Sequence, residues 1–196
     1  MKSIRVLAIN GSPRKGGNTE IMLREVLNVL AEHGIKTDFF QLGGKNVSGC
    51  NACMKCKKKK DGFCHQKNDV LNKCIEKMTR ADGIIIGSPV YFTDVTPEVK
   101  ALIDVAGYAG RAGGNIYRRK VGAAVVAVRR AGAIHTFDTI NHFFLINEMV
   151  VPGSSYWNIG IGRDKGDVLK DEEGIKTMRT LGENMAWVLK GLRQAL

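Results

Sequence analysis

The sequence predicts an α/β protein built on an open parallel sheet with helices on both faces. Apolar runs of strand length alternate with segments whose apolar residues recur at helical spacing, five times along the chain. One of these runs, residues 83–87, holds three successive isoleucines, as expected of a strand buried on both sides. Because 196 residues suffice for one full hydrophobic core, we expect a single domain over 1–196.

The elements follow in order. An apolar strand over 4–9 leads into a glycine-rich loop, and a helix over 19–31 with one apolar face ends at Gly34. A second strand over 35–41 is followed by a long loop, a helix over 69–79 and the isoleucine-rich strand. Together these segments predict the first three strands of the sheet and the helices that connect them.

The second half of the chain continues the alternation. Thr96-Pro97-Glu98 is a strong helix start, because it combines a capping hydroxyl, a proline in the first turn and an acid near the positive helix end. A fourth strand is predicted over 121–128, a helix over 137–145, a fifth strand over 148–151 and a closing helix over 172–192. The stretches 43–68 and 106–119, rich in glycine, lysine and arginine, are predicted as long loops.

Composition and charge narrow the class of protein. Hydrophobic residues make up 44% and charged residues 25%, as in a soluble globular protein, and the net charge of +11 favours acidic partners. Aromatic residues are not interleaved with the basic runs, so we expect no nucleic-acid partner. No apolar stretch matches a signal peptide or a membrane span, which predicts a cytoplasmic protein with reduced thiols and no membrane partner.

The loop after the first strand has the features of a phosphate-binding loop. Residues 10–19 read Asn-Gly-Ser-Pro-Arg-Lys-Gly-Gly-Asn-Thr between a strand and a helix. Glycines such as Gly17 let the backbone approach a ligand, and the helix start and Arg14 favour an anion. The pattern lacks the endings of the triphosphate and dinucleotide loops, so a monophosphate fits better. Alternatively, Ser12, Asn18 and Thr19 only cap the helix.

Two further loops lie at the same edge of the predicted sheet. The segment 87–93 follows the third strand, and its aromatic residues can enclose a flat ring or pack beneath the loop. The segment 129–133 follows the fourth strand, where Arg129 or a backbone amide such as that of Gly132 can stabilise negative charge on a ring. Alternatively, Arg129 and Arg130 form a solvated surface pair.

Four of the five cysteines fall within fifteen positions, at Cys50, Cys53, Cys56 and Cys64. In a reduced compartment such crowding favours ligands over disulfides, and soft thiolates suit an iron–sulfur cluster or zinc. A set without metal remains the third interpretation. The four lysines at 57–60 favour a reduced anionic cluster or an acidic partner, or they are simply solvated. Cys74 lies on the apolar face of its predicted helix and is interpreted as a core residue.

These motifs together resemble a known family. The Gly-Ser-Pro-Arg-x-Gly-Gly-Asn-Thr loop, the Ser-Pro-Val-Tyr-Phe segment at 88–92 and Lys-Ala-Leu-Ile-Asp at 100–104 are similar to the NADPH-dependent FMN reductases, over roughly residues 1–130. The compact cysteine set is similar to that of the iron–sulfur flavoproteins within that group. The resemblance implies a flavodoxin-like, doubly wound five-stranded sheet of order 2-1-3-4-5, with the cysteine loop as an insertion at about 43–68.

The resemblance also implies roles for individual residues. The FMN phosphate would be held by Ser12, Arg14, Asn18 and Thr19. The ribityl chain and ring would be lined by Pro89, Val90, Tyr91, Phe92 and Thr93. A four-iron, four-sulfur cluster would be ligated by Cys50, Cys53, Cys56 and Cys64.

The function that follows is that of an FMN-dependent oxidoreductase and electron carrier. Its flavin would exchange electrons with NAD(P)H or a ferredoxin-like donor and pass them through the cluster to an acceptor, with no side chain acting as acid or base. The resemblance implies a homodimer or homotetramer in which the cysteine loop of one subunit approaches the flavin of another. The alternatives are a cluster-free NAD(P)H-dependent reductase of flavins or quinones, and a non-enzymatic redox sensor or zinc-stabilised binding module.

Overall fold

The computed structural model describes residues 3–194 and contains a five-stranded parallel sheet of order β2-β1-β3-β4-β5. The strands are β1 (Arg5–Asn10), β2 (Lys36–Gln41), β3 (Gly83–Pro89), β4 (Val121–Val128) and β5 (Ile159–Ile161). Both the parallel sheet and its order confirm the prediction. The order reverses between β1 and β3, so a crevice for a ligand is expected beyond the carboxyl ends of these strands.

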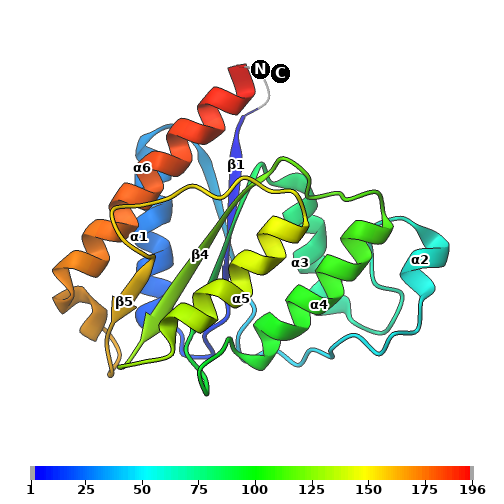
Figure 1. The fold of residues 1–196 in the computed structure, drawn as a ribbon, viewed down its shortest axis with the longest axis horizontal. Helices are drawn as coiled ribbons and strands as arrows, with labels where there is room; N and C mark the ends of the chain where they lie inside the picture. Colours follow the sequence, from blue (N-terminus) through cyan, green and yellow to red (C-terminus); the bar gives the residue numbers. More distant parts are fainter. Residues whose placement is uncertain (1–2, 195–196) are drawn as a thin grey trace.

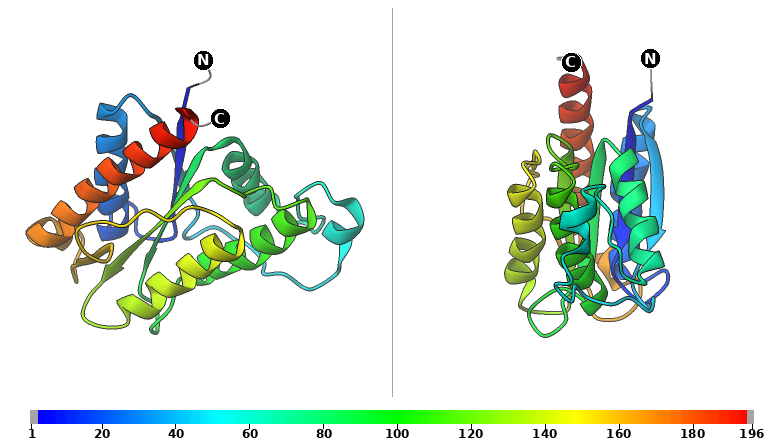
Figure 2. Two further views of the ribbon diagram at one scale, coloured as in Figure 1. Left: turned by 45° about the horizontal axis from the view of Figure 1, so that its top comes forward. Right: turned by 90° about the vertical axis from the view of Figure 1, so that its right-hand side faces the viewer.

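Helices cover both faces of the sheet (Figure 1; Figure 2). They are α1 (Asn18–Glu32), α2 (Lys55–Lys59), α3 (Asp69–Arg80), α4 (Pro97–Ala112), α5 (Ala133–Ile146), the 3-10 helix η1 (Asp167–Lys170) and α6 (Glu172–Gln194). Helices α1 and α6 pack on one face, and α3, α4 and α5 pack on the other. Within the described residues no helix is both long and apolar enough to cross a membrane.

Two hydrophobic cores arise because successive strand residues point to opposite faces. Along β1, Leu7 and Ile9 join the core under α3, α4 and α5, whereas Val6 and Ala8 join the core under α1 and α6. All eight residues of β4 and the first six of β3 are buried. The isoleucine-rich run therefore forms a strand covered on both sides, as its sequence predicts.

The predicted loop over 106–119 is wrong for its first half, because α4 continues to Ala112. Gly107 and Gly110 lie on the buried face of the helix, which ends only at its C-cap residue Gly113. A Cβ built on Gly110 would stand 2.5 Å from the ring of Tyr117, and one on Gly107 would stand 3.6 Å from Phe143. The glycines therefore allow close packing within a helix that nearby side chains stabilise.

The predicted fifth strand over 148–151 is also wrong. Val150 pairs with β4 only through an isolated bridge to Val121, after which the chain reaches Pro152, which has no N–H to donate. The fifth strand starts eleven residues later, at Ile159–Ile161, beside the end of β4. In addition, α5 begins at Ala133 rather than near 137, and the cysteine loop contains the short helix α2.

Candidate functional site

A cavity of about 400 Å³ lies beyond the carboxyl ends of β1, β3 and β4, where the strand order reverses. Eight of the predicted cofactor residues line it: Ser12, Arg14, Asn18, Thr19, Pro89, Val90, Tyr91 and Arg129. Four further lining residues were not predicted: Ala127, Gly162, Arg163 and Asp164. The three segments that the sequence placed at one sheet edge therefore meet around one cavity.

The loop between β1 and α1 is folded by its own hydrogen bonds. The Gly11 N–H donates to the Gly87 carbonyl at 2.7 Å, and the Arg14 N–H donates to the Ser12 hydroxyl at 3.2 Å. A Cβ built on Gly43 would stand 2.3 Å from the Ser12 carbonyl carbon, so only glycine fits behind the loop. The loop is thus supported closely by β3 and by the segment after β2.

The start of α1 is free to face a ligand. Gly17 is the N-cap residue, and no side chain makes a capping hydrogen bond there. The first amides of a helix have no partner within the helix, and they carry the positive end of its dipole. Of the candidate caps, the Ser12 hydroxyl bonds Arg14 and the Asn18 amide bonds the 164–166 segment. Within the described residues these side chains therefore do not cap the helix. The free amides at the start of α1 suit an anion instead.

The Asn18 side chain connects the loop between β1 and α1 to the loop after β5. Its amide N–H donates to the Asp164 carbonyl at 2.9 Å, and its oxygen accepts the Gly166 N–H at 2.9 Å. This places Arg163 at the cavity. The sequence analysis missed it because the fifth strand was expected at 148–151, so the basic Gly-Arg-Asp-Lys-Gly segment was not placed at the sheet edge.

The cavity wall is strongly basic. Arg14, Arg129 and Arg163 line it, and among the described residues none of them has an ion-pair partner. Asp164 is the single acid among the lining residues. Arginines without a carboxylate partner at a cavity wall favour the binding of an anionic ligand.

The aromatic segment after β3 forms a tight hairpin. Tyr91 and Asp94 exchange backbone hydrogen bonds of 2.8 and 3.0 Å, and the central residues Phe92 and Thr93 have φ angles of 45° and 74°, as in a type I′ turn. Tyr91 lines the cavity, but Phe92 is fully exposed at the tip and Thr93 does not line the cavity either. Among the predicted ring-lining residues, Phe92 and Thr93 are therefore outside this cavity, and their contact with a ring stays a prediction.

Two predicted glycines act by supporting the cavity rather than by lining it. Gly132, at φ 88°, lies against the hairpin, since a Cβ there would stand 3.0 Å from the Thr93 Cα. The Thr136 hydroxyl donates to the Thr93 carbonyl at 3.2 Å, which fixes the hairpin further. Gly17 serves as the N-cap of α1.

Glu20, in α1, stabilises the loop between β1 and α1 through a hydrogen bond. Its carboxylate accepts the Gly16 N–H at 2.7 Å and pairs with Arg24 at 2.7 Å, and its side chain is 14% exposed. Burial raises the pKa of Glu20, but the hydrogen bonds from Gly16 and Arg24 outweigh it and hold the pKa below its usual value of 4.5.

Glu20→Gln is therefore expected to destabilise the protein by at most about 1 kcal/mol at pH 7. A lowered pKa gives stability that is present above pH 4.5 and is lost as the pH falls through the folded-state pKa. The difference between the two proteins should consequently vanish in acid. Denaturant unfolding at pH 7 and at stepped lower pH measures it, and a difference that persists in acid would contradict the role of the charge.

The four predicted ligand cysteines line one small cavity between the cysteine loop and α4. Cys50, Cys53, Cys56 and Cys64 share it with three residues of α4, namely Val105, Tyr108 and Ala109. All four are free thiols. Cys74 is fully buried in α3 and does not line the cavity, in agreement with its interpretation as a core residue.

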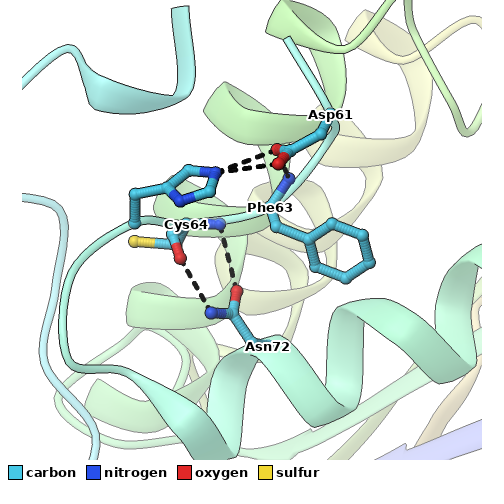
Figure 3. A network of polar contacts seen from close by, with 5 residues as sticks. Asp61, Phe63, Cys64 and Asn72 are labelled. Atoms are coloured by element: carbon cyan, nitrogen blue, oxygen red, sulfur yellow. Dashed lines mark hydrogen bonds and ion pairs between the residues drawn. The ribbon is translucent and has the colours of Figure 1, made fainter. Parts of the chain in front are cut away.

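Cys64 is the most firmly held of the four (Figure 3). Its N–H donates to the Asn72 side-chain oxygen at 3.0 Å, and its carbonyl accepts the Asn72 amide at 2.7 Å. Burial raises the pKa of the Cys64 thiol, and the other three cysteines raise it further, although a backbone hydrogen bond from Gln66 acts in the opposite sense. The adjacent His65 ring pairs with Asp61 at 2.9 Å. The His65 imidazole therefore contacts a carboxylate at the surface.

The other three cysteines lie on a loop of unusual backbone conformation. Ala52 and Met54 have φ angles of 55° and 59°, and the Ala52 N–H lies 3.4 Å from the Cys50 sulfur. Among the described residues no group of three or more histidine, cysteine or acidic side chains is arranged to hold a single metal ion. Each ligand of a four-iron cluster binds a different iron, so its thiolates stand farther apart than those around one ion. Four free thiols on the wall of one cavity fit such a cluster in number and in chemical type.

The sheet order and the loop after β1 together define a flavodoxin-like protein. The model for the NADPH-dependent FMN reductase family matches residues 4–164, and this chain belongs to that family. Family membership places it among the flavoprotein oxidoreductases.

Similar proteins agree with this assignment. The chain is 40% identical over 198 residues to an iron–sulfur flavoprotein of Methanocaldococcus jannaschii, covering 97% of this chain and 100% of that protein. It is 34% identical to an iron–sulfur flavoprotein of Archaeoglobus fulgidus, covering 94% of this chain and 97% of that one.

Solved structures share the fold at low identity. A flavone reductase superposes with a TM-score of 0.76 at 19% identity, over 98% of this chain and 65% of that chain. A WrbA-like flavodoxin from Agrobacterium tumefaciens superposes with a TM-score of 0.67 at 13% identity, over 97% of this chain and 99% of that one.

Proposed function

We propose that this protein is an iron–sulfur flavoprotein that carries electrons between NAD(P)H or a ferredoxin-like donor and an acceptor. FMN would occupy the cavity beyond β1, β3 and β4, and a four-iron, four-sulfur cluster would be held by Cys50, Cys53, Cys56 and Cys64. The observation that carries the proposal is the convergence of these four thiols on one cavity in a chain of the FMN reductase family. The relatives that are named iron–sulfur flavoproteins support it.

The flavin cavity supports a monophosphate better than a neutral ligand. The uncapped start of α1 and the Arg14 side chain offer donors to a phosphate, while Tyr91 and Pro89 line the cavity beyond it. A volume of about 400 Å³ lies within the range of pockets that bind ligands of cofactor size. When bound, FMN would supply hydride and single-electron chemistry, and the protein would bind and orient it.

The surroundings of the cysteine cavity support an anionic cluster and an acidic partner. The lysines of α2 and its C-cap, Lys55 and Lys57 to Lys60, are all exposed beside the thiols. Positive charge near a cluster favours its reduced form, and it also attracts an acidic protein during the encounter.

We propose a cytoplasmic protein whose partners are redox proteins or small molecules, with no role in binding nucleic acid or membranes.

Subunit assembly forms part of the proposal. Figure 1 places α2 beyond α4, on the opposite side of the molecule from α1 and β5. The flavin cavity lies at the start of α1, so the two sites of one chain do not share a wall. In a homodimer or homotetramer, the cysteine loop of one subunit would lie near the flavin of another, which would shorten the path for electrons.

The deciding experiment is anaerobic purification followed by an absorbance spectrum and iron and sulfide analysis. We expect two resolved flavin bands, a broad shoulder that dithionite bleaches, and about four iron and four sulfide per chain. Flavin without iron would instead favour a cluster-free NAD(P)H-dependent reductase. A colourless protein that takes up no added FMN would reject both functions and leave a redox-sensing or zinc-binding module.

A further inference from the structure

We propose that Tyr108, on α4, is the positioning residue that holds the cysteine loop in the arrangement its ligands need. The inference rests on the proposed cluster but can also be tested without it. Tyr108 is partly buried and lines the small cavity together with all four cysteines. It also lines a larger groove between α4 and α5 that reaches Cys50. Tyr108 therefore lies at the junction of the small cavity and the groove, next to Cys50 in both.

Within residues 49–60 of the cysteine loop, Tyr108 makes the side-chain hydrogen bond and the cation–π contact to the rest of the described chain. The other side-chain hydrogen bonds of residues 49–60 in the described chain join residues within that segment. The Tyr108 hydroxyl donates to the Met54 sulfur at 3.1 Å, and the Lys57 ammonium lies 5.5 Å from the centre of the Tyr108 ring. One aromatic side chain thus contacts the loop on both sides of Cys56.

Met54 is the residue whose position matters most for the thiols. It lies between Cys53 and Cys56, is the N-cap of α2, and has a left-handed conformation with φ 59° and ψ 9°. A residue other than glycine adopts this conformation only where its surroundings hold it. The hydrogen bond from Tyr108 to the Met54 sulfur supplies that restraint. Loss of the restraint would let Cys53 and Cys56 turn away from Cys64.

The test compares Tyr108→Phe, Met54→Leu and the double variant with the wild-type full-length chain. Tyr156→Phe is the matched control, because Tyr156 is exposed and its hydroxyl makes no hydrogen bond among the described residues. In the iron-loaded protein, Tyr108→Phe should release iron to a chelator about fivefold faster and should alter the electron paramagnetic resonance spectrum of the reduced cluster. FMN affinity should not change. The double variant should release iron no faster than the more severe single variant, because Tyr108→Phe and Met54→Leu remove the same interaction.

A second readout keeps the inference independent of the cluster. In metal-free protein, Tyr108→Phe should raise the reaction rates of Cys53 and Cys56 with a thiol reagent about fivefold, with little change at Cys64. If the wild type holds FMN but no iron, the proposed cluster fails while this readout still decides the role of Tyr108. Iron release and thiol reactivity equal to those of Tyr156→Phe would overturn the inference. So would a uniform rise at all four thiols with a lower unfolding temperature, because that result indicates a general structural role.

Discussion

If the proposed cluster is present, Cys64→Ser is expected to remove it while leaving FMN binding in place. Cys64 is 9% exposed and is fixed by both hydrogen bonds to Asn72, so a serine there keeps the backbone arrangement but replaces a soft ligand with a poor one. After anaerobic reconstitution, iron should fall from about four per chain to less than about one. Iron and sulfide analysis, with the spectrum of the dithionite-reduced protein, measures the change.

The buried cysteine of α3 provides the matched control. Cys74→Ala also removes a buried thiol, but Cys74 lies in the core and outside the thiol cavity, so iron content should stay at the wild-type level. FMN affinity should be the same in both variants because the flavin cavity contains no cysteine. Full cluster occupancy in Cys64→Ser would show that this thiol is not a ligand. Equal loss of iron and FMN would point to general unfolding instead.

Local sequence signals predicted the parts of the fold that depend on neighbouring residues. The isoleucine-rich run gave a buried strand, and the proline and threonine at 96–97 marked the start of α4. The loop after β1 was placed correctly between a strand and a helix, because an apolar run precedes it and a helical pattern follows it. The convergence of four cysteines on one cavity likewise follows from their close spacing.

The errors arose where distant parts of the chain decide the local structure. Gly107 and Gly110 looked like the beginning of a loop, but Phe143 and Tyr117 pack against them and keep α4 helical. The fifth strand has only three residues and gains its identity from pairing with the end of β4. No periodicity marks so short a strand.

The same reason explains what was missed at the sites. Arg163 reaches the flavin cavity only because β5 ends there, and Tyr108 meets the cysteine loop across 54 positions of sequence. Phe92 was grouped with Tyr91 because both are aromatic, but the turn geometry points consecutive side chains differently. Which of two neighbouring aromatics faces a cavity depends on backbone angles that composition does not specify.

Ser12→Asp is expected to weaken FMN binding about a thousandfold, because two like charges about 4 Å apart repel by ~4 kcal/mol at an effective dielectric constant near 20. Ser12 is 4% exposed and lines the cavity beside Arg14 and Thr19. An aspartate can still accept the Arg14 N–H that the serine hydroxyl accepts now, so the loop itself should persist. Titration of the metal-free protein with FMN, followed by flavin fluorescence, measures the affinity.

Ser12→Ala separates charge from shape, because it removes the hydroxyl without adding a carboxylate and should cost about tenfold or less. Riboflavin, which lacks the phosphate, provides the sharper comparison. If the loop at the start of α1 holds the phosphate, Ser12→Asp should remove most of the preference for FMN over riboflavin, and the loss should shrink at high salt. The iron content should remain unchanged, since Ser12 lies outside the thiol cavity. An unchanged preference in Ser12→Asp would place the phosphate elsewhere and would remove the central support for a flavin in this cavity.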